Sequence, residues 1–150
     1  MQAGQDRAVK VLNSLIETTL DSANGYKEAA ENIGDAELRT MFTERAERRR
    51  EIAGQLQAEV RSFGGEPQDD QSTMGKMHNK FVDLKTSMGA DSDKSVIDEV
   101  ERGEDVIKGK YEHALKDDDL PPQSRQLVGR AFETIRADHD EISAMKHRMH

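Results

Sequence analysis

The stretch of sequence that decides the fold is residues 64–93, GGEPQDDQSTMGKMHNKFVDLKTSMGADSD. Two glycines and a proline open it and a polar QDDQS linker follows, which predicts that a helix ends here. Apolar residues within 73–88 predict a short helix in the middle of the stretch. The stretch is long enough to travel from one end of a long helix to the other, so it can serve as a crossover.

Four periodic runs flank this stretch, two on each side. In each run apolar residues recur at intervals of three and four, which is the spacing of one helix face. Gly34 and Asp35 predict a tight turn between the first two runs, and the break before Pro122 separates the last two. No alternating strand pattern occurs. The expected long helices are residues 6–33, 36–63, 94–116 and 123–149.

The two tight turns predict two antiparallel hairpins, one on each side of the crossover. Hairpin, long crossover, hairpin is the arrangement of ferritin-like four-helix bundles. We therefore expect an all-α, ferritin-like four-helix bundle that forms a single domain over residues 1–150. A simple up-down bundle, capped by the short helix, is the alternative topology.

The composition narrows the classes of function. The net charge of −8 argues against nucleic acid or an anionic membrane surface as a partner, because both bind basic faces. The absence of Cys excludes disulfides, thiolate zinc sites and thiol catalysis. No apolar stretch is long enough to span a membrane, and residues 1–10 lack the apolar run of a signal peptide. We expect a cytoplasmic protein.

Charged residues fall on the faces that should form the core. At about 100° per residue, Arg45 and Arg49 lie near the centre of the apolar arc of the second helix. Glu101 and Glu104 share the apolar face of the fourth run, and His139 lies between apolar residues of the last helix. Arg49, Glu104 and His139 are each close to the middle of their helix. In an aligned bundle these residues should therefore meet in one layer, with Arg45 one turn away.

Two interpretations of this layer compete. The first is a buried ion network of Arg45, Arg49, Glu101, Glu104 and His139, because buried charge is tolerated when it is paired. The alternative is a site for iron or another divalent metal, with Glu101, Glu104 and His139 as ligands. The chain contains no Glu-x-x-His motif, and the two arginines would repel a cation. The ion network is the preferred interpretation.

Other motifs give little support for catalysis. Ser and Thr have no His and Asp partners at a recognisable spacing, and no glycine-rich phosphate loop is present. We therefore assign no catalytic residue and expect a non-enzymatic protein. His113, in the sequence HALK, has a weak similarity to the histidine of phosphotransfer bundles. His78 is expected to lie on the short helix and to help pack it onto the bundle.

Several stretches resemble an uncharacterised bacterial family of small four-helix-bundle proteins within the ferritin-like superfamily. They are LNSLIETTLDSANGYKEAAENI at 12–33, RSFGGEP at 61–67, MHNKFVDLK at 77–85 and ERGEDVIKGKYEHALKDDDLPP at 101–122. The resemblance implies a ferritin-like bundle that is often associated with general stress, with no established catalytic activity. Glu101, Glu104 and Asp105 match the ERGED element of the family, and Arg49 matches a recurrent arginine of the second helix. The Glu-x-x-His ligands of the superfamily have no counterpart.

The leading hypothesis is a stress-associated bundle that acts as a homo-oligomer or through a protein partner. The alternative is an iron-binding or ferroxidase-type protein that uses the inward Glu and His residues. The third is a phosphotransfer module through His113.

Overall fold

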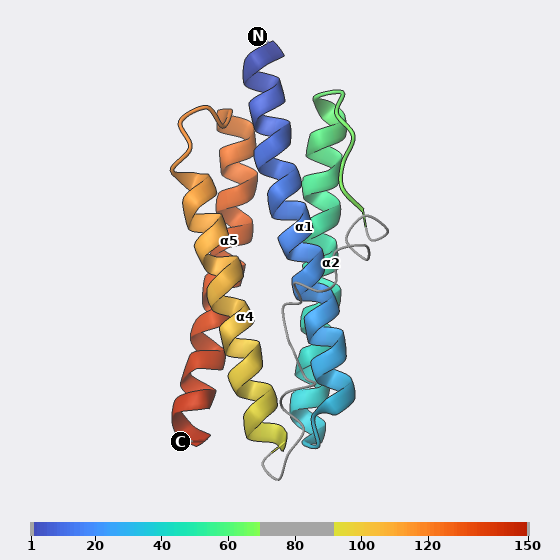
Figure 1. Ribbon diagram of the computed structural model, residues 1–150, viewed down its shortest axis with the longest axis vertical. Coiled ribbons are helices and arrows are strands. Elements are labelled where there is room, and N and C mark those ends of the chain that lie inside the picture. The colour runs from blue at the N-terminus through green and yellow to red at the C-terminus, as the bar shows by residue number, and fades with distance from the viewer. Residues whose placement is uncertain (1, 70–91, 150) are drawn as a thin grey trace.

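Residues 2–69 and 92–149 are described in the computed structural model, and they form four helices without a strand (Figure 1). The helices are α1 (Gln2–Asn32), α2 (Ala36–Ser62), α4 (Ser92–Leu115) and α5 (Pro122–Met149). This confirms the predicted all-α fold. The short helix expected at 73–88, together with His78, lies outside the described residues.

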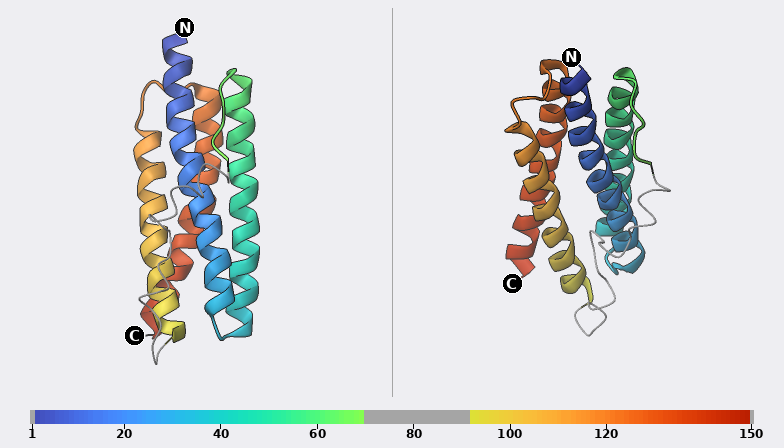
Figure 2. Two further views of the ribbon diagram at one scale, coloured as in Figure 1. Left: turned by 45° about the vertical axis from the view of Figure 1, so that its right-hand side comes forward. Right: turned by 45° about the horizontal axis from the view of Figure 1, so that its top comes forward.

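The helices form two antiparallel hairpins, α1 with α2 and α4 with α5, which lie side by side (Figures 1 and 2). α2 ends where α1 begins, whereas α4 begins at the opposite end of the bundle, beside the turn between α1 and α2. There the backbone N–H groups of Gly34 and Asp35 donate to the Asp93 carboxylate, at 2.7 and 3.2 Å. α2 and α4 therefore run in the same direction. This is the ferritin-like topology with a crossover, and the simple up-down alternative is excluded.

The ends of α2 follow from residues that cap helices. Asp35 precedes the helix in an extended conformation, and its side chain accepts a hydrogen bond from the backbone N–H of Leu38 at 3.0 Å. Gly64, just after the helix, has a φ of 77°, which favours glycine. A Cβ at Gly65 would lie only 2.9 Å from Cγ2 of Val9. The turn that leads into the crossover therefore depends on glycine at both positions.

The corner between α4 and α5 is held by one arginine. Arg125 donates to the carbonyl oxygens of Leu115 and Asp117, at 2.5 and 2.6 Å. These bonds satisfy carbonyl groups that the end of α4 leaves without helical partners. Arg7, near the start of α1, pairs with the Asp117 carboxylate at 2.9 Å. The corner is thus tied to both α5 and α1.

The core is mainly apolar, but every helix also buries polar side chains, and among the described residues the buried arginines are both on α2. Arg45 and Arg49 of α2 are only 4% and 0% exposed. α1 packs closely on α2 and on α4, and α4 packs closely on α5, whereas α2 and α5 approach each other much less closely. The long arginine side chains fill this wider space. None of the described helices has an apolar stretch that could cross a membrane.

Candidate functional site

The centre of the bundle holds an ion pair that is closed to solvent. Arg49 of α2 and Glu104 of α4 are both 0% exposed. Arg49 Nη1 donates to Glu104 Oε1 at 2.8 Å, and Nη2 donates to Oε2 at 2.9 Å. Two parallel bonds of this kind form the strongest arrangement of an arginine with a carboxylate. The structure thus brings together two of the residues that the helix periodicity places in one layer.

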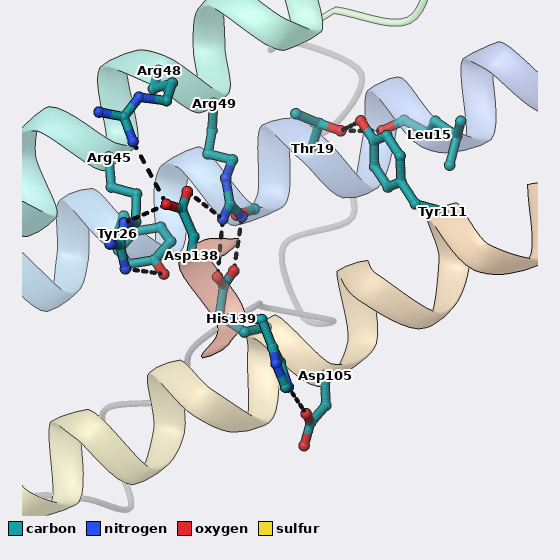
Figure 3. A network of polar contacts seen from close by, with 12 residues as sticks. Leu15, Thr19, Tyr26, Arg45, Arg48, Arg49, Asp105, Tyr111, Asp138 and His139 are labelled. Atoms are coloured by element: carbon teal, nitrogen blue, oxygen red, sulfur yellow. Dashed lines mark hydrogen bonds and ion pairs between the residues drawn. The ribbon is translucent and has the colours of Figure 1, made fainter. Parts of the chain in front are cut away.

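From α2, the same guanidinium group contacts the other three helices (Figure 3). In addition to Glu104 of α4, Arg49 donates to Ser22 Oγ of α1 at 2.6 Å and to Asp138 Oδ2 of α5 at 3.1 Å. The centroid of the Tyr26 ring lies 5.3 Å from Arg49 Cζ, within the range of a cation–π contact. Arg49 is therefore the central cross-link of the bundle.

Asp138 is the second carboxylate of the network, and it faces three arginines of α2 (Figure 3). Besides its bond to Arg49, its Oδ1 lies 3.5 Å from Arg45 Nε and 3.6 Å from Arg48 Nη1. Arg45 also pairs with Glu141 and donates to the Tyr26 hydroxyl at 3.4 Å. The buried part of the network, two arginines with Glu104 and Asp138, is therefore close to neutral.

Sequence reasoning missed Asp138 and chose its neighbour His139. Both residues flank the buried stripe that Ile135 and Ile142 mark on α5. One residue is 100° further round the helix than the other, so the two lie on opposite edges of the stripe. His139 is likewise four and three residues from Ile135 and Ile142, so the periodicity of α5 alone does not distinguish the two residues.

Glu101 lies outside the network, contrary to the expectation. Its Oε1 accepts from Lys146 Nζ at 2.9 Å and its Oε2 accepts from Ser143 Oγ at 3.1 Å. Both partners are on α5, in the part of the helix close to its C-terminal end. Glu101 is one turn before Glu104 on α4, and at that level α5 presents a lysine and a serine to it.

His139 also lies outside the network, on the outer side of the contact between α4 and α5 (Figure 3). Its Nε2 is 2.6 Å from Asp105 Oδ1, and its Nδ1 is 3.2 Å from Asp140 Oδ1. Partial burial lowers the pKa of His139, but the bonds to Asp105 and Asp140 outweigh it, and the net pKa lies above the ordinary value. A protonated imidazole would therefore tie the two helices of this hairpin together.

The electrostatics of the network keep its arginines charged and its tyrosine neutral. Burial lowers the pKa of Arg49, but Glu104, Tyr26 and Asp138 together outweigh it, so the net pKa lies above the ordinary value. Burial raises the pKa of Tyr26, and the negative charge of Glu104 raises it further. Arg49 and Tyr26 therefore do not gain or lose a proton near neutral pH.

The donor set does not fit a divalent metal. Both oxygens of Glu104 accept bonds from Arg49, and Glu101 and His139 are engaged elsewhere. Among residues 2–69 and 92–149, no group of three His, Cys, Asp or Glu side chains converges as a metal site would require. A cation at Glu104 would have to displace a buried guanidinium group.

Two further polar features have structural roles. Tyr111 of α4 and Thr19 of α1 are both fully buried, and their hydroxyl oxygens are 2.7 Å apart. Thr19 donates to the Leu15 carbonyl oxygen at 2.6 Å, so the Tyr111 hydroxyl donates to Thr19. Glu59, near the end of α2, accepts from Ser124 Oγ at 2.6 Å in the first turn of α5. His113 is exposed near the end of α4.

Comparison with known proteins supports the fold. Residues 7–117 match a domain family described only as a domain of unknown function, DUF2383. The chain also superimposes on a mutant of Dps1 from Mycobacterium smegmatis with a TM-score of 0.83 and 14% identity, over 97% of this chain and 99% of that one. No curated protein matches the sequence. At this identity the structural likeness establishes the ferritin-like fold alone.

Proposed function

Because the chain belongs to the DUF2383 family, a family without an assigned activity, we propose its function from the geometry of the bundle centre. The protein is a non-enzymatic, stress-associated ferritin-like bundle of the bacterial cytoplasm. It acts by self-association or through a protein partner. The centre of its core holds an ion network, in which the carboxylates are paired with arginines and are not free to bind a metal.

The observation that carries this proposal is the position of Arg49. Its guanidinium group occupies the middle of the bundle and binds Glu104 and Asp138, the two buried carboxylates of that layer. A dication site in a helical bundle needs an excess of inward carboxylates. Here two buried arginines balance the two buried carboxylates, so little negative charge is left to attract a cation.

Metal content after loading tests the absence of a metal function. The protein, purified without a tag, would be loaded anaerobically with Fe(II), freed of excess metal and analysed for its elements. We expect less than one iron per chain and the same residual content in Glu104→Ala. The control is Glu112→Ala, which removes an exposed carboxylate from the same helix. Stoichiometric iron that Glu104→Ala abolishes and Glu112→Ala retains would establish the metal-binding alternative.

Self-association is the second part of the proposal. Among the residues that the structure describes, Val106 is the only large apolar residue that is exposed, at 47%. An interface on this part of the surface would therefore be mainly polar. Sedimentation velocity over a wide concentration range at low and high salt should show a dimer or larger species that salt weakens. A monomer under all conditions would remove self-association and leave a protein partner as the mode of action.

His113 is exposed, so a test of phosphotransfer to this residue is possible. Incubation with a phosphorylated receiver domain should give no label on the wild-type chain. A label that His113→Gln abolishes would instead support phosphotransfer.

A further inference from the structure

The two hairpins of the bundle meet along two seams, and the seams differ in character. We call them the α1–α4 seam and the α2–α5 seam, after the helices that face each other. The helices of the α1–α4 seam approach closely, whereas those of the α2–α5 seam are further apart (Figure 2). The difference raises the question of which side of the bundle separates first.

The α1–α4 seam is mainly apolar and is tied at one end. The buried residues of α4 are apolar except for Glu104 and the tyrosine hydroxyl. Near the C-terminal end of α4, Tyr111 bonds to Thr19 of α1, with 2.7 Å between their oxygens. At the end of the seam, Asp93 accepts two backbone N–H bonds from the turn between α1 and α2. Separating these helices would expose the buried apolar residues of α1 and α4 to water.

The α2–α5 seam is held by charged and polar contacts. Asp138 of α5 lies 3.1 to 3.6 Å from nitrogen atoms of three arginines of α2. The outer members of this cluster reach solvent, because the side chains of Arg48 and Glu141 are 49% and 54% exposed. Near the end of the seam, Glu59 binds Ser124 and Gln123 through hydrogen bonds. Water can therefore replace many of these contacts when the helices separate.

We propose that the bundle opens along the α2–α5 seam, with the α1–α4 seam as the hinge. Exposing apolar surface has no compensation in water, whereas separated charges regain much of their hydration. The Arg49–Glu104 pair joins α2 to α4 across the bundle, so it is the latch that limits the opening. The open state gives water and solutes access to the guanidinium groups of Arg45 and Arg49.

Distance measurements between spin labels test the direction of opening. The chain has no Cys, so labels attach only at introduced cysteines. Glu51→Cys with Arg136→Cys spans the α2–α5 seam, and Ser14→Cys with Lys110→Cys spans the α1–α4 seam; all four positions are exposed. Each pair would be measured in the native background and with Asp138→Asn.

We expect Asp138→Asn to broaden the distance distribution and shift it to longer values across the α2–α5 seam only. The substitution keeps the shape of the side chain and removes the charge that three arginines share. Equal broadening across both seams, or no change across either, would overturn the proposal.

Hydrogen exchange provides the second measurement. In Asp138→Asn, central amides of α2 and α5 should exchange about ten- to a hundredfold faster, while those of α1 and α4 stay protected. Tyr111→Phe is the matched control, because it removes a polar contact of the other seam, and it should not accelerate exchange in α5. A uniform increase in all four helices would mean global unfolding and would contradict a hinged opening.

A milder variant keeps the test decisive if Asp138→Asn does not fold. Glu141→Gln removes an exposed partner of Arg45 and leaves the buried pairs in place. With this variant, raising the salt concentration should increase exchange in α2 and α5 more than in α1 and α4. The same response in both pairs of helices would count against the proposal.

Discussion

Arg49 and Glu104 form a bidentate ion pair in which neither side chain reaches solvent. A buried pair of this kind adds little compared with apolar residues of the same size, but losing one partner leaves an isolated charge in the core. Single and double substitutions at these two positions separate the two effects.

Arg49→Leu should lower the free energy of unfolding by roughly 3–5 kcal/mol, because it leaves Glu104 buried without a cation. Urea unfolding followed by circular dichroism gives the value. Arg102→Leu, which removes a half-exposed arginine from the surface of α4, serves as the control and should change stability little. If Arg49→Leu is as mild as the control, Glu104 is not held in the way that the structure shows.

Replacing both partners should be less harmful than replacing either one. In Arg49→Leu with Glu104→Leu, the isolated charge disappears and leucines occupy the space of the pair. We expect the double variant to be more stable than both single variants in the same urea series. Strict additivity of the two single effects would contradict a direct interaction.

The two tyrosines of the chain, Tyr26 and Tyr111, should resist ionisation in the folded state. Burial raises the pKa of Tyr111 to about 12, although the bond to Thr19 opposes it, and burial raises the pKa of Tyr26 further. Since the folded pKa exceeds the unfolded value of about 10, this stabilisation is complete below pH 10 and is lost as pH rises above it. Phenolate absorbance should therefore appear together with the loss of helical circular dichroism. Ionisation near pH 10 in a fully helical protein would show that the phenols are accessible.

His139 should make stability depend on pH near neutrality. Its folded pKa is raised above 6.5, so its contribution is complete below that pH and is lost as pH rises through the folded pKa. The stability difference between wild type and His139→Gln should therefore be larger at pH 5.5 than at pH 8, which lie about 1 unit below and about 1.5 units above the ordinary pKa. His113→Gln removes an exposed imidazole from the same hairpin and is the control. A difference that is the same at both pH values would rule out the protonated contact with Asp105.

Two glycines should respond to alanine in opposite directions. Gly65→Ala places a Cβ 2.9 Å from Cγ2 of Val9 and 3.1 Å from Cγ1 of Val60, and the overlap should cost about 1–3 kcal/mol. Gly54→Ala meets open space on α2 and should stabilise by roughly 1 kcal/mol through helix propensity. Thermal unfolding of both variants measures the contrast. A neutral Gly65→Ala would mean that the turn after α2 adapts to a side chain.

Much of the fold follows from the sequence because it depends on local signals. The cap at Asp35 and the glycine at 64 mark the ends of α2, and the length of the next stretch indicates a crossover. The pairing of Arg49 with Glu104 can be predicted from the sequence because each residue lies at the centre of the apolar arc of its helix. Asp138 and His139 lie at opposite edges of the apolar arc of α5. Which of the two enters the network depends on which helix packs beside each edge. Periodicity along one helix does not contain that information.

The crossover also has a consequence for the order of folding. Within each hairpin the interacting residues are close in sequence, whereas contacts between hairpins join distant residues: 59 positions separate Gly34 from Asp93, and 89 separate Arg49 from Asp138. Loop closure makes such contacts slow to form, so we expect the hairpins to form first and to dock late. Asp138→Asn should then mainly accelerate unfolding and leave the refolding rate nearly unchanged in stopped-flow measurements. A matching loss in the refolding rate would instead place the contact between hairpins in the transition state.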